Sequence, residues 1–181
     1  MSAPRELRKE AFYNYPPQRV WAALTDADAL AQWLMPNTFK PVEGHAFQFR
    51  VDPMPMLPGT TTNCRVLELV PPRRMVWSWE MEPAKGKKTL PPQVITWELT
   101  PKDGGTLLTF TQRSSGPGAG LPFLYRLMMS HGWKTMLKRW LPKVLDSFEQ
   151  TADGRFAYRR LAKAPNRGHH GTKTLPPEFH T

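Results

Sequence analysis

The stretch that decides the fold runs from Met75 to Met81 and reads Met-Val-Trp-Ser-Trp-Glu-Met. Its largest apolar side chains occupy every second position, which is typical of a β-strand with one face against a core. A similar alternation recurs at residues 47–51, 60–70, 95–99 and 108–110. The sequence therefore predicts a sheet built from these five runs.

Short turns separate the runs and indicate how the strands pair. Lys102-Asp103-Gly104-Gly105 stands between the last two runs, and Asp-Gly is a strong signal for a tight hairpin. Strands that follow one another through short connections pair most simply as an antiparallel meander. Residues 5–13 suit a further strand at the start of the chain.

Two short helices are expected between the first strand and the meander. Pro16 and Pro17 stop the strand and preset a first helical turn. Thr25 followed by Asp28 resembles a capping box and predicts the start of a second helix. The residue before Pro36 is pushed out of the helical region, so this helix ends near Met35.

A long amphipathic helix is predicted over residues 123–150. Its apolar positions recur at three- and four-residue spacing and form one wide face: Trp133, Leu137, Trp140, Leu141, Val144, Leu145 and Phe148. Pro142 removes a helical hydrogen bond, so we expect a kink near residues 138–142. A sheet with one apolar face needs a cover, and this helix can supply it with a space left between the two.

Composition excludes several classes of protein. The chain has 181 residues, of which 40% are hydrophobic, and this suits a single domain with a sizeable core. Its one cysteine, Cys64, excludes an internal disulfide and a multi-thiolate metal site, and we expect neither a metal nor another cofactor. No run approaches the about 20 apolar residues of a membrane span. The opening residues lack the apolar core of a secretory signal, so the predicted location is cytoplasmic.

Charge divides the chain into two parts. Residues 1–151 hold 19 Lys/Arg and 13 Asp/Glu, whereas residues 152–181 hold 6 and 2 and are poor in aliphatic side chains. Such a segment has little apolar surface with which to offset its ordering entropy. We therefore predict a domain at 1–151 and a basic C-terminal extension at 152–181 that is flexible or loosely docked.

Four stretches together resemble a known superfamily. They are VWAALTDADALAQWLMPNTFKPVEGHAFQFR, LELVPPRRMVWSW, ITWELTPKDGGTLLTF and HGWKTMLKRWL, within residues 8–150. In order and spacing they resemble the SRPBCC (START-like, Bet v 1-like) superfamily, in particular its activator of Hsp90 ATPase homologue 1-like branch. The resemblance implies an α+β helix-grip fold, with a curved antiparallel sheet around a long C-terminal helix and an apolar cavity between them. It also implies binding of lipophilic molecules, and some relatives are cyclases or other enzymes.

Large apolar side chains on the inward parity of the strands and on the covering helix are the candidate ligand-binding residues. Indole rings fill irregular space poorly and their N–H groups need partners when buried, so these residues either wall a pocket for a hydrophobic or aromatic small molecule or form a solid core. Near the cavity mouth we place Trp33 and Met35. The remaining candidates are Phe47, Phe49, Trp77, Trp79, Trp97, Phe110, Met129, Trp133 and Leu137.

Two other functions stay open on the sequence. A cyclase or dehydratase acting on a polyketide-like substrate needs an ionisable group in the cavity, for which His131 is the best candidate, although the pattern favours a partly exposed position for it on the helix. A chaperone- or stress-related interaction protein would use the basic extension. Glu68, Glu80 and Glu98 fall on the solvent side, and Cys64 has no neighbouring base that would make it a nucleophile. Nucleic acid is not an expected partner, no catalytic residue is assigned, and monomer and homodimer are both possible.

Overall fold

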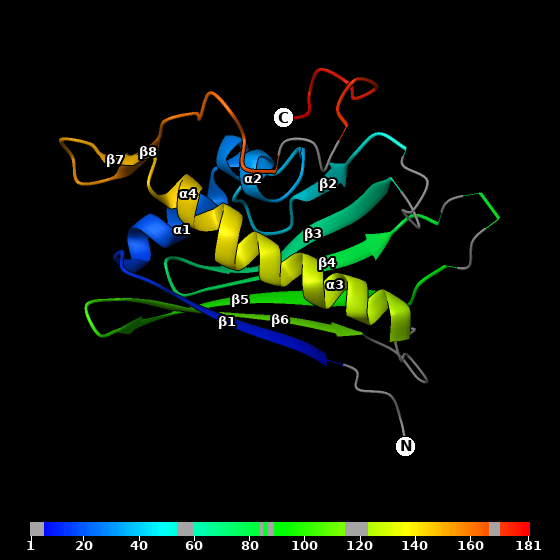
Figure 1. Ribbon diagram of the computed structural model, residues 1–181, viewed down its shortest axis with the longest axis horizontal. Coiled ribbons are helices and arrows are strands. Elements are labelled where there is room, and N and C mark those ends of the chain that lie inside the picture. The colour runs from blue at the N-terminus through cyan, green and yellow to red at the C-terminus, as the bar shows by residue number, and fades with distance from the viewer. Residues whose placement is uncertain (1–5, 54–59, 84, 87–88, 115–122, 167–170) are drawn as a thin grey trace.

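An antiparallel sheet forms one layer of the protein (Figure 1). The computed structural model describes residues 6–53, 60–83, 85–86, 89–114, 123–166 and 171–181. Within them, six strands pair in the order β1-β6-β5-β4-β3-β2. Their bounds are β1 Glu6–Tyr13, β2 Ala46–Arg50, β3 Thr61–Val70, β4 Arg74–Met81, β5 Gln93–Lys102 and β6 Gly105–Ser114.

The meander predicted from the alternating runs is confirmed. Each strand from β2 to β5 pairs antiparallel with the next, and β1 adds to the far side of β6. Lys102 pairs with Gly105 across a two-residue turn in which Asp103 and Gly104 have φ of 47° and 77°. Only a turn with positive φ at both central residues matches the twist of the two strands, and Asp-Gly adopts it readily.

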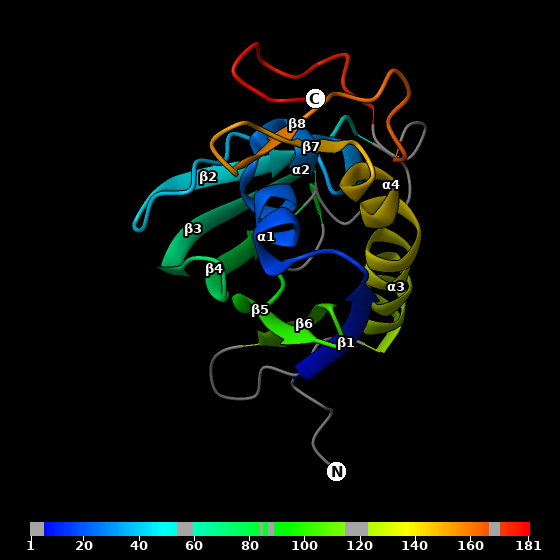
Figure 2. The same ribbon diagram turned by 90° about the vertical axis from the view of Figure 1, so that its left-hand side faces the viewer.

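Helices cover the concave face of the sheet. The long C-terminal helix consists of α3 (Phe123–Thr135), a π-helical turn η1 (Met136–Trp140) and α4 (Leu141–Leu145), and it lies across the sheet. Figure 2 shows the sheet curving around this helix, with α1 (Pro17–Thr25) and α2 (Ala27–Trp33) at one end. The α+β helix-grip fold predicted from the sequence is therefore confirmed.

The start of α2 differs from the predicted capping box. The cap is Asp26, whose Oδ1 accepts a hydrogen bond from the Ala29 amide at 2.9 Å. Thr25 is the last residue of α1, and its hydroxyl donates back to the Trp21 carbonyl at 2.8 Å. Two capping candidates stand next to each other, and the short connection between the helices leaves only Asp26 free to cap.

The irregularity predicted near residues 138–142 takes the form of the π-helical turn η1. In this turn the Leu141 amide bonds to the Met136 carbonyl, five residues earlier. The next bond of the series would run from residue 142 to the Leu137 carbonyl, but Pro142 has no N–H. The buried hydroxyl of Tyr13, on β1, donates to that carbonyl at 2.6 Å instead. Burial raises the pKa of Tyr13 far above its usual value, so this donor stays protonated.

The helix ends earlier than predicted, at Leu145 rather than near Gln150. Phe148–Gln150 forms β7, which pairs with β8 (Phe156–Tyr158) in a small hairpin. Thr151 lies in the turn of this hairpin, where its amide donates to the Arg155 carbonyl. The division of the chain at Thr151 stays a prediction, and a strand pair spans that position.

Replacing Tyr13 by Phe tests the bond across the π-helical turn. Tyr13→Phe leaves the Leu137 carbonyl buried without a donor, so we expect the free energy of unfolding in urea to fall by about 1–3 kcal/mol. Tyr15→Phe is the matched control, because the Tyr15 hydroxyl bonds to Asp146 at an exposed site. The control should change stability by less than about 0.5 kcal/mol. Equal stability of Tyr13→Phe and the native protein would contradict this account.

Candidate functional site

One connected group of aromatic rings fills the space between the sheet and the covering helices. We call this group the aromatic cluster. All of its members are buried, and neighbouring ring centroids lie 4.2–6.0 Å apart. Its members from the candidate residues are Trp33, Phe47, Phe49, Trp77, Trp79, Trp97, Phe110 and Trp133.

The centre of the cluster is the contact between sheet and helix. Trp133 of α3 lies 4.2 Å from Phe110 and 5.7 Å from Trp97, measured between ring centroids. Trp97 in turn meets Trp77 at 5.5 Å in an edge-to-face arrangement. Such geometry is favourable for aromatic pairs beyond the area they bury. In this structure the rings themselves occupy the place where the sequence predicts a cavity.

The other candidate residues also lie in or against this core. Leu137 is buried, and Met35 and Met129 are partly buried against it. Trp33, expected near a cavity mouth, is instead fully buried, and its Nε1 donates to the Ala23 carbonyl at 3.0 Å. Phe39 also joins the cluster, 5.0 Å from Phe47 between centroids. Phe39 was not among the predicted residues because it stands outside the alternating runs.

Three buried indole donors have no hydrogen-bond partner. Among the described residues, no acceptor reaches Nε1 of Trp77, Trp79 or Trp97. All three side chains are buried, whereas the N–H groups of Trp33 and Trp133 are satisfied. A buried donor left unpaired costs about 1–3 kcal/mol, and such groups are rare in folded proteins. Trp79 lies beside the Tyr125 hydroxyl, which leaves Trp77 and Trp97 as two positions of the cluster that can receive a hydrogen-bond acceptor.

A short polar network lies beneath α3. Trp133 Nε1 donates to Gln112 Oε1 at 2.7 Å, and Gln112 Nε2 donates to Gln93 Oε1 at 2.5 Å. The Tyr125 hydroxyl lies beside Gln93 and Trp79. Burial raises the pKa of Tyr125, and these two neighbouring side chains partly oppose the rise. The sequence analysis did not identify Gln93, Gln112 or Tyr125. The alternation of the strands could have identified the two glutamines, because both lie on the inward side with Trp97 and Phe110.

The structure does not place the predicted acid–base candidate inside. His131 is exposed on α3. Cys64 is buried, and burial followed by the charge of Glu80 raises the pKa of its thiol, which makes it a poor nucleophile. Glu68 and Glu98 both pair with Arg74 at partly exposed positions, at 3.1 Å and 2.6 Å. The predicted solvent-side placement of these two carboxylates is therefore confirmed.

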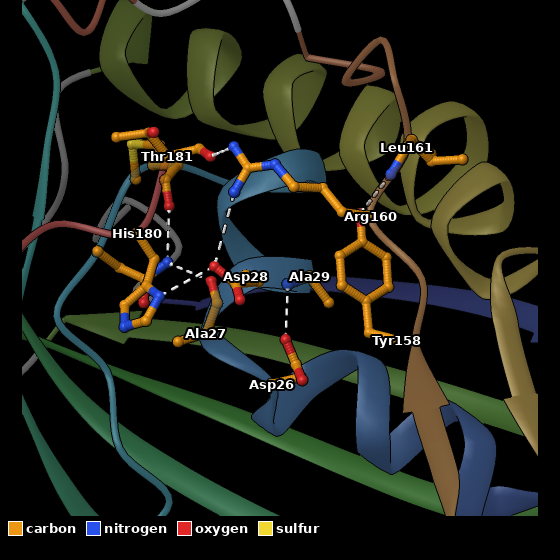
Figure 3. Close-up of polar contacts among 11 residues, drawn as sticks. Asp26, Ala27, Asp28, Ala29, Tyr158, Arg160, Leu161, His180 and Thr181 are labelled. Carbon is orange, nitrogen blue, oxygen red and sulfur yellow. Dashed lines mark hydrogen bonds and ion pairs between the residues drawn. The ribbon is translucent and has the colours of Figure 1, made fainter. Parts of the chain in front are cut away.

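The described residues after β8, 159–166 and 171–181, form the C-terminal segment. This segment packs against α2 (Figure 3). Asn166 is buried, and its Nδ2 donates to the carbonyl oxygens of Ala31, at 2.7 Å, and Leu34, at 3.3 Å. Further along, His180 exchanges two backbone hydrogen bonds with Asn37. Its Nδ1 lies 3.0 Å from Oδ1 of Asp28. Figure 3 shows the two side chains facing each other.

A second anchor of this segment is Asp52. Its carboxylate accepts hydrogen bonds from the amides of Lys173 and Thr174 and from the Thr174 hydroxyl, which lower the pKa of Asp52. The sequence predicts a flexible or loosely docked extension, but the described residues of this segment make specific contacts. The reason is that polar side chains bonded to backbone groups, and the buried ring of Phe179, hold it where aliphatic residues are scarce.

Four hollows open elsewhere on the molecule. The one of about 250 Å³ between α2 and the C-terminal segment is lined by Ala31, Gln32, Leu161 and Asn166, among others, with Arg160 also at its wall. Two others are lined by strand residues of the sheet, and the fourth lies between β1 and η1. None of these four is lined by a tryptophan of the aromatic cluster.

No group of three or more His, Cys, Asp or Glu side chains is placed to hold a metal ion in the part of the chain that the structure describes. No helix among the described residues is long and apolar enough to cross a membrane.

The fold is that of a START-like helix-grip protein, and comparison with known families agrees. The family described as activator of Hsp90 ATPase homolog 1-like protein matches residues 14–146. The chain therefore belongs to this family. No curated protein matches the sequence.

Solved structures show the same fold. Protein MLL2253 from Mesorhizobium loti is 29% identical with a TM-score of 0.66, over 78% of this chain and 97% of that one. DynU16, described as a protein in the dynemicin biosynthetic locus, is 21% identical with a TM-score of 0.64, over 80% of this chain and 48% of that one. The Aha1 dimer from Colwellia psychrerythraea is 18% identical with a TM-score of 0.56, over 73% and 90%.

Replacing Asn166 tests how the C-terminal segment is held. Asn166→Ala removes the donor to the Ala31 and Leu34 carbonyls at the end of α2, so we expect unfolding to become easier by about 1–3 kcal/mol in urea. Lys163→Ala, at an exposed position of the same segment, is the control and should stay within about 0.5 kcal/mol of the native protein. A segment that is not docked would make the two variants equally stable.

Proposed function

We propose that this protein binds a flat, apolar small molecule with a hydrogen-bond acceptor, held between the sheet and α3. The observation that carries the proposal is the pair of unpartnered indole donors, Trp77 Nε1 and Trp97 Nε1, inside the buried aromatic cluster. A ligand carbonyl or ether oxygen would satisfy a donor that is otherwise left unpaired. Aromatic rings on both sides would stack against the body of the ligand.

Access to the cluster requires α3 to move away from the sheet, because the rings fill the space in this structure. Of the 13 residues of α3, only Tyr125 and Trp133 are buried. The helix is thus attached through few large side chains, and a ligand that replaces their contacts can offset the cost of lifting it. Partly buried Met129 and Met136 lie against the core, and their flexible thioethers adapt to differently shaped partners.

The family relation supports a binding role. One neighbour in fold, DynU16, comes from a biosynthetic locus, and the helix-grip fold places a covered apolar face where a ligand can lie. The aromatic lining favours ring-shaped molecules over long acyl chains. His131, the acid–base candidate of the sequence, is exposed, and burial raises the pKa of Tyr125, the ionisable group beside Trp79, so we propose binding rather than catalysis.

Two compounds of the same shape give a direct test. 2-Acetylnaphthalene carries a carbonyl acceptor, and 2-ethylnaphthalene replaces it by a methylene group. We expect a saturable change in tryptophan fluorescence with both compounds, and tighter binding of the ketone. Trp97→Phe removes the N–H and keeps an aromatic ring, so it should weaken binding of the ketone roughly fivefold, which corresponds to about 1 kcal/mol, and leave the hydrocarbon nearly unchanged.

Trp21→Phe is the matched control, since Trp21 is partly exposed on α1. It should alter neither affinity. Circular dichroism of each variant confirms that it folds. If folded native protein gives no saturable response to either compound, or if the ketone and the hydrocarbon bind equally and Trp97→Phe changes neither, the proposed site is wrong.

A further inference from the structure

The outer side of α3 exposes a continuous set of large apolar side chains. Phe123, Leu124, Leu127 and Met128 are 66%, 76%, 57% and 41% exposed. They stand in the first two turns of the helix, on the side away from buried Tyr125 and Trp133. Large apolar groups that gather on a surface in this way mark a place of interaction. We call these four residues the apolar patch.

The rest of the same helix is basic. Between residues 123 and 145 the sequence has five basic residues and no Asp or Glu: Arg126, Lys134, Lys138, Arg139 and Lys143. The last four are exposed. Among the described residues, the ion pairs involve none of the five. The first carboxylate after the helix, Asp146, already accepts a hydrogen bond from Tyr15.

Apolar and basic side chains share one exposed stripe. At 100° per residue, Lys134 and Lys138 project on the same side of the helix as Phe123 and Leu127. The stripe therefore runs from apolar at the N-terminal end to positively charged towards η1. On a bilayer surface this stripe would place its apolar end below the headgroups and its cations among them.

We propose that this stripe binds the surface of an anionic lipid bilayer. Such a surface provides an apolar layer for the patch and negative charge that attracts the lysines. A second copy of the chain fits less well, because a two-fold contact on this helix would bring ten unpaired positive charges together. The bilayer binding is peripheral, and it is independent of the ligand site on the inner side of α3.

Vesicle sedimentation tests the proposal. The full chain is mixed with vesicles of phosphatidylcholine alone, or of phosphatidylcholine with one quarter phosphatidylglycerol. We expect binding to the anionic vesicles, little to the neutral ones, and a decrease as salt is raised. Leu124→Ser with Leu127→Ser removes apolar area without changing charge and should weaken binding at least tenfold. Lys134→Gln with Lys138→Gln should do the same.

Matched variants elsewhere separate a specific surface from the general net charge of +10. Leu67→Ser with Val42→Ser removes two other exposed apolar side chains, and Lys40→Gln with Lys102→Gln removes two other exposed lysines. Both control pairs should bind like the native protein. The proposal is wrong if folded native protein does not bind anionic vesicles, or if the patch variants and the control variants lose binding equally. It is also wrong if the native protein does not bind vesicles and sedimentation velocity shows a dimer that Leu124→Ser with Leu127→Ser converts to monomer.

Discussion

The contact of Trp133 with the sheet is the interaction on which the rest of the structure depends. Its ring lies 4.2 Å from Phe110 between centroids, and its Nε1 donates to Gln112, so one side chain ties the covering helix to the sheet by packing and by a hydrogen bond. The curvature of the sheet brings aromatic residues of β2, β4, β5 and β6 towards this point. Without it, α3 would have Tyr125 as its remaining buried side chain among the described residues.

Most of the fold follows from the period of the sequence. Alternation around Trp77 and Trp97 places large rings on one face, and the Asp103-Gly104 turn fixes the register of the last hairpin. The candidate residues come together because parity alone decides which face they share. Their role in ligand binding stays a prediction, since packing into a core and lining a pocket require the same pattern.

Other features depend on contacts between distant residues and could not be predicted. The π-helical turn follows locally from Pro142, but its stabilisation by Tyr13 spans 124 positions along the chain. The C-terminal segment is held by Asn166 and Asp52 through hydrogen bonds to backbone groups. Amino-acid composition does not predict such bonds. Gln93 and Gln112 were overlooked because a polar residue at inward parity can be read as an interruption of the strand pattern.

The two faces of α3 carry different kinds of side chain and support the two proposed binding sites. Its inner face meets an aromatic cluster with unpartnered donors, and its outer face exposes apolar and basic side chains together.

The central claim is that a ligand acceptor binds at the indole donors. It is tested most directly by nuclear magnetic resonance of the indole N–H groups during titration with 2-acetylnaphthalene. The account predicts large, saturable shifts for Trp77 and Trp97 and none comparable for Trp33, whose N–H is already bonded to the Ala23 carbonyl. Shifts of equal size at all three indoles, or none at Trp77 and Trp97, would contradict it.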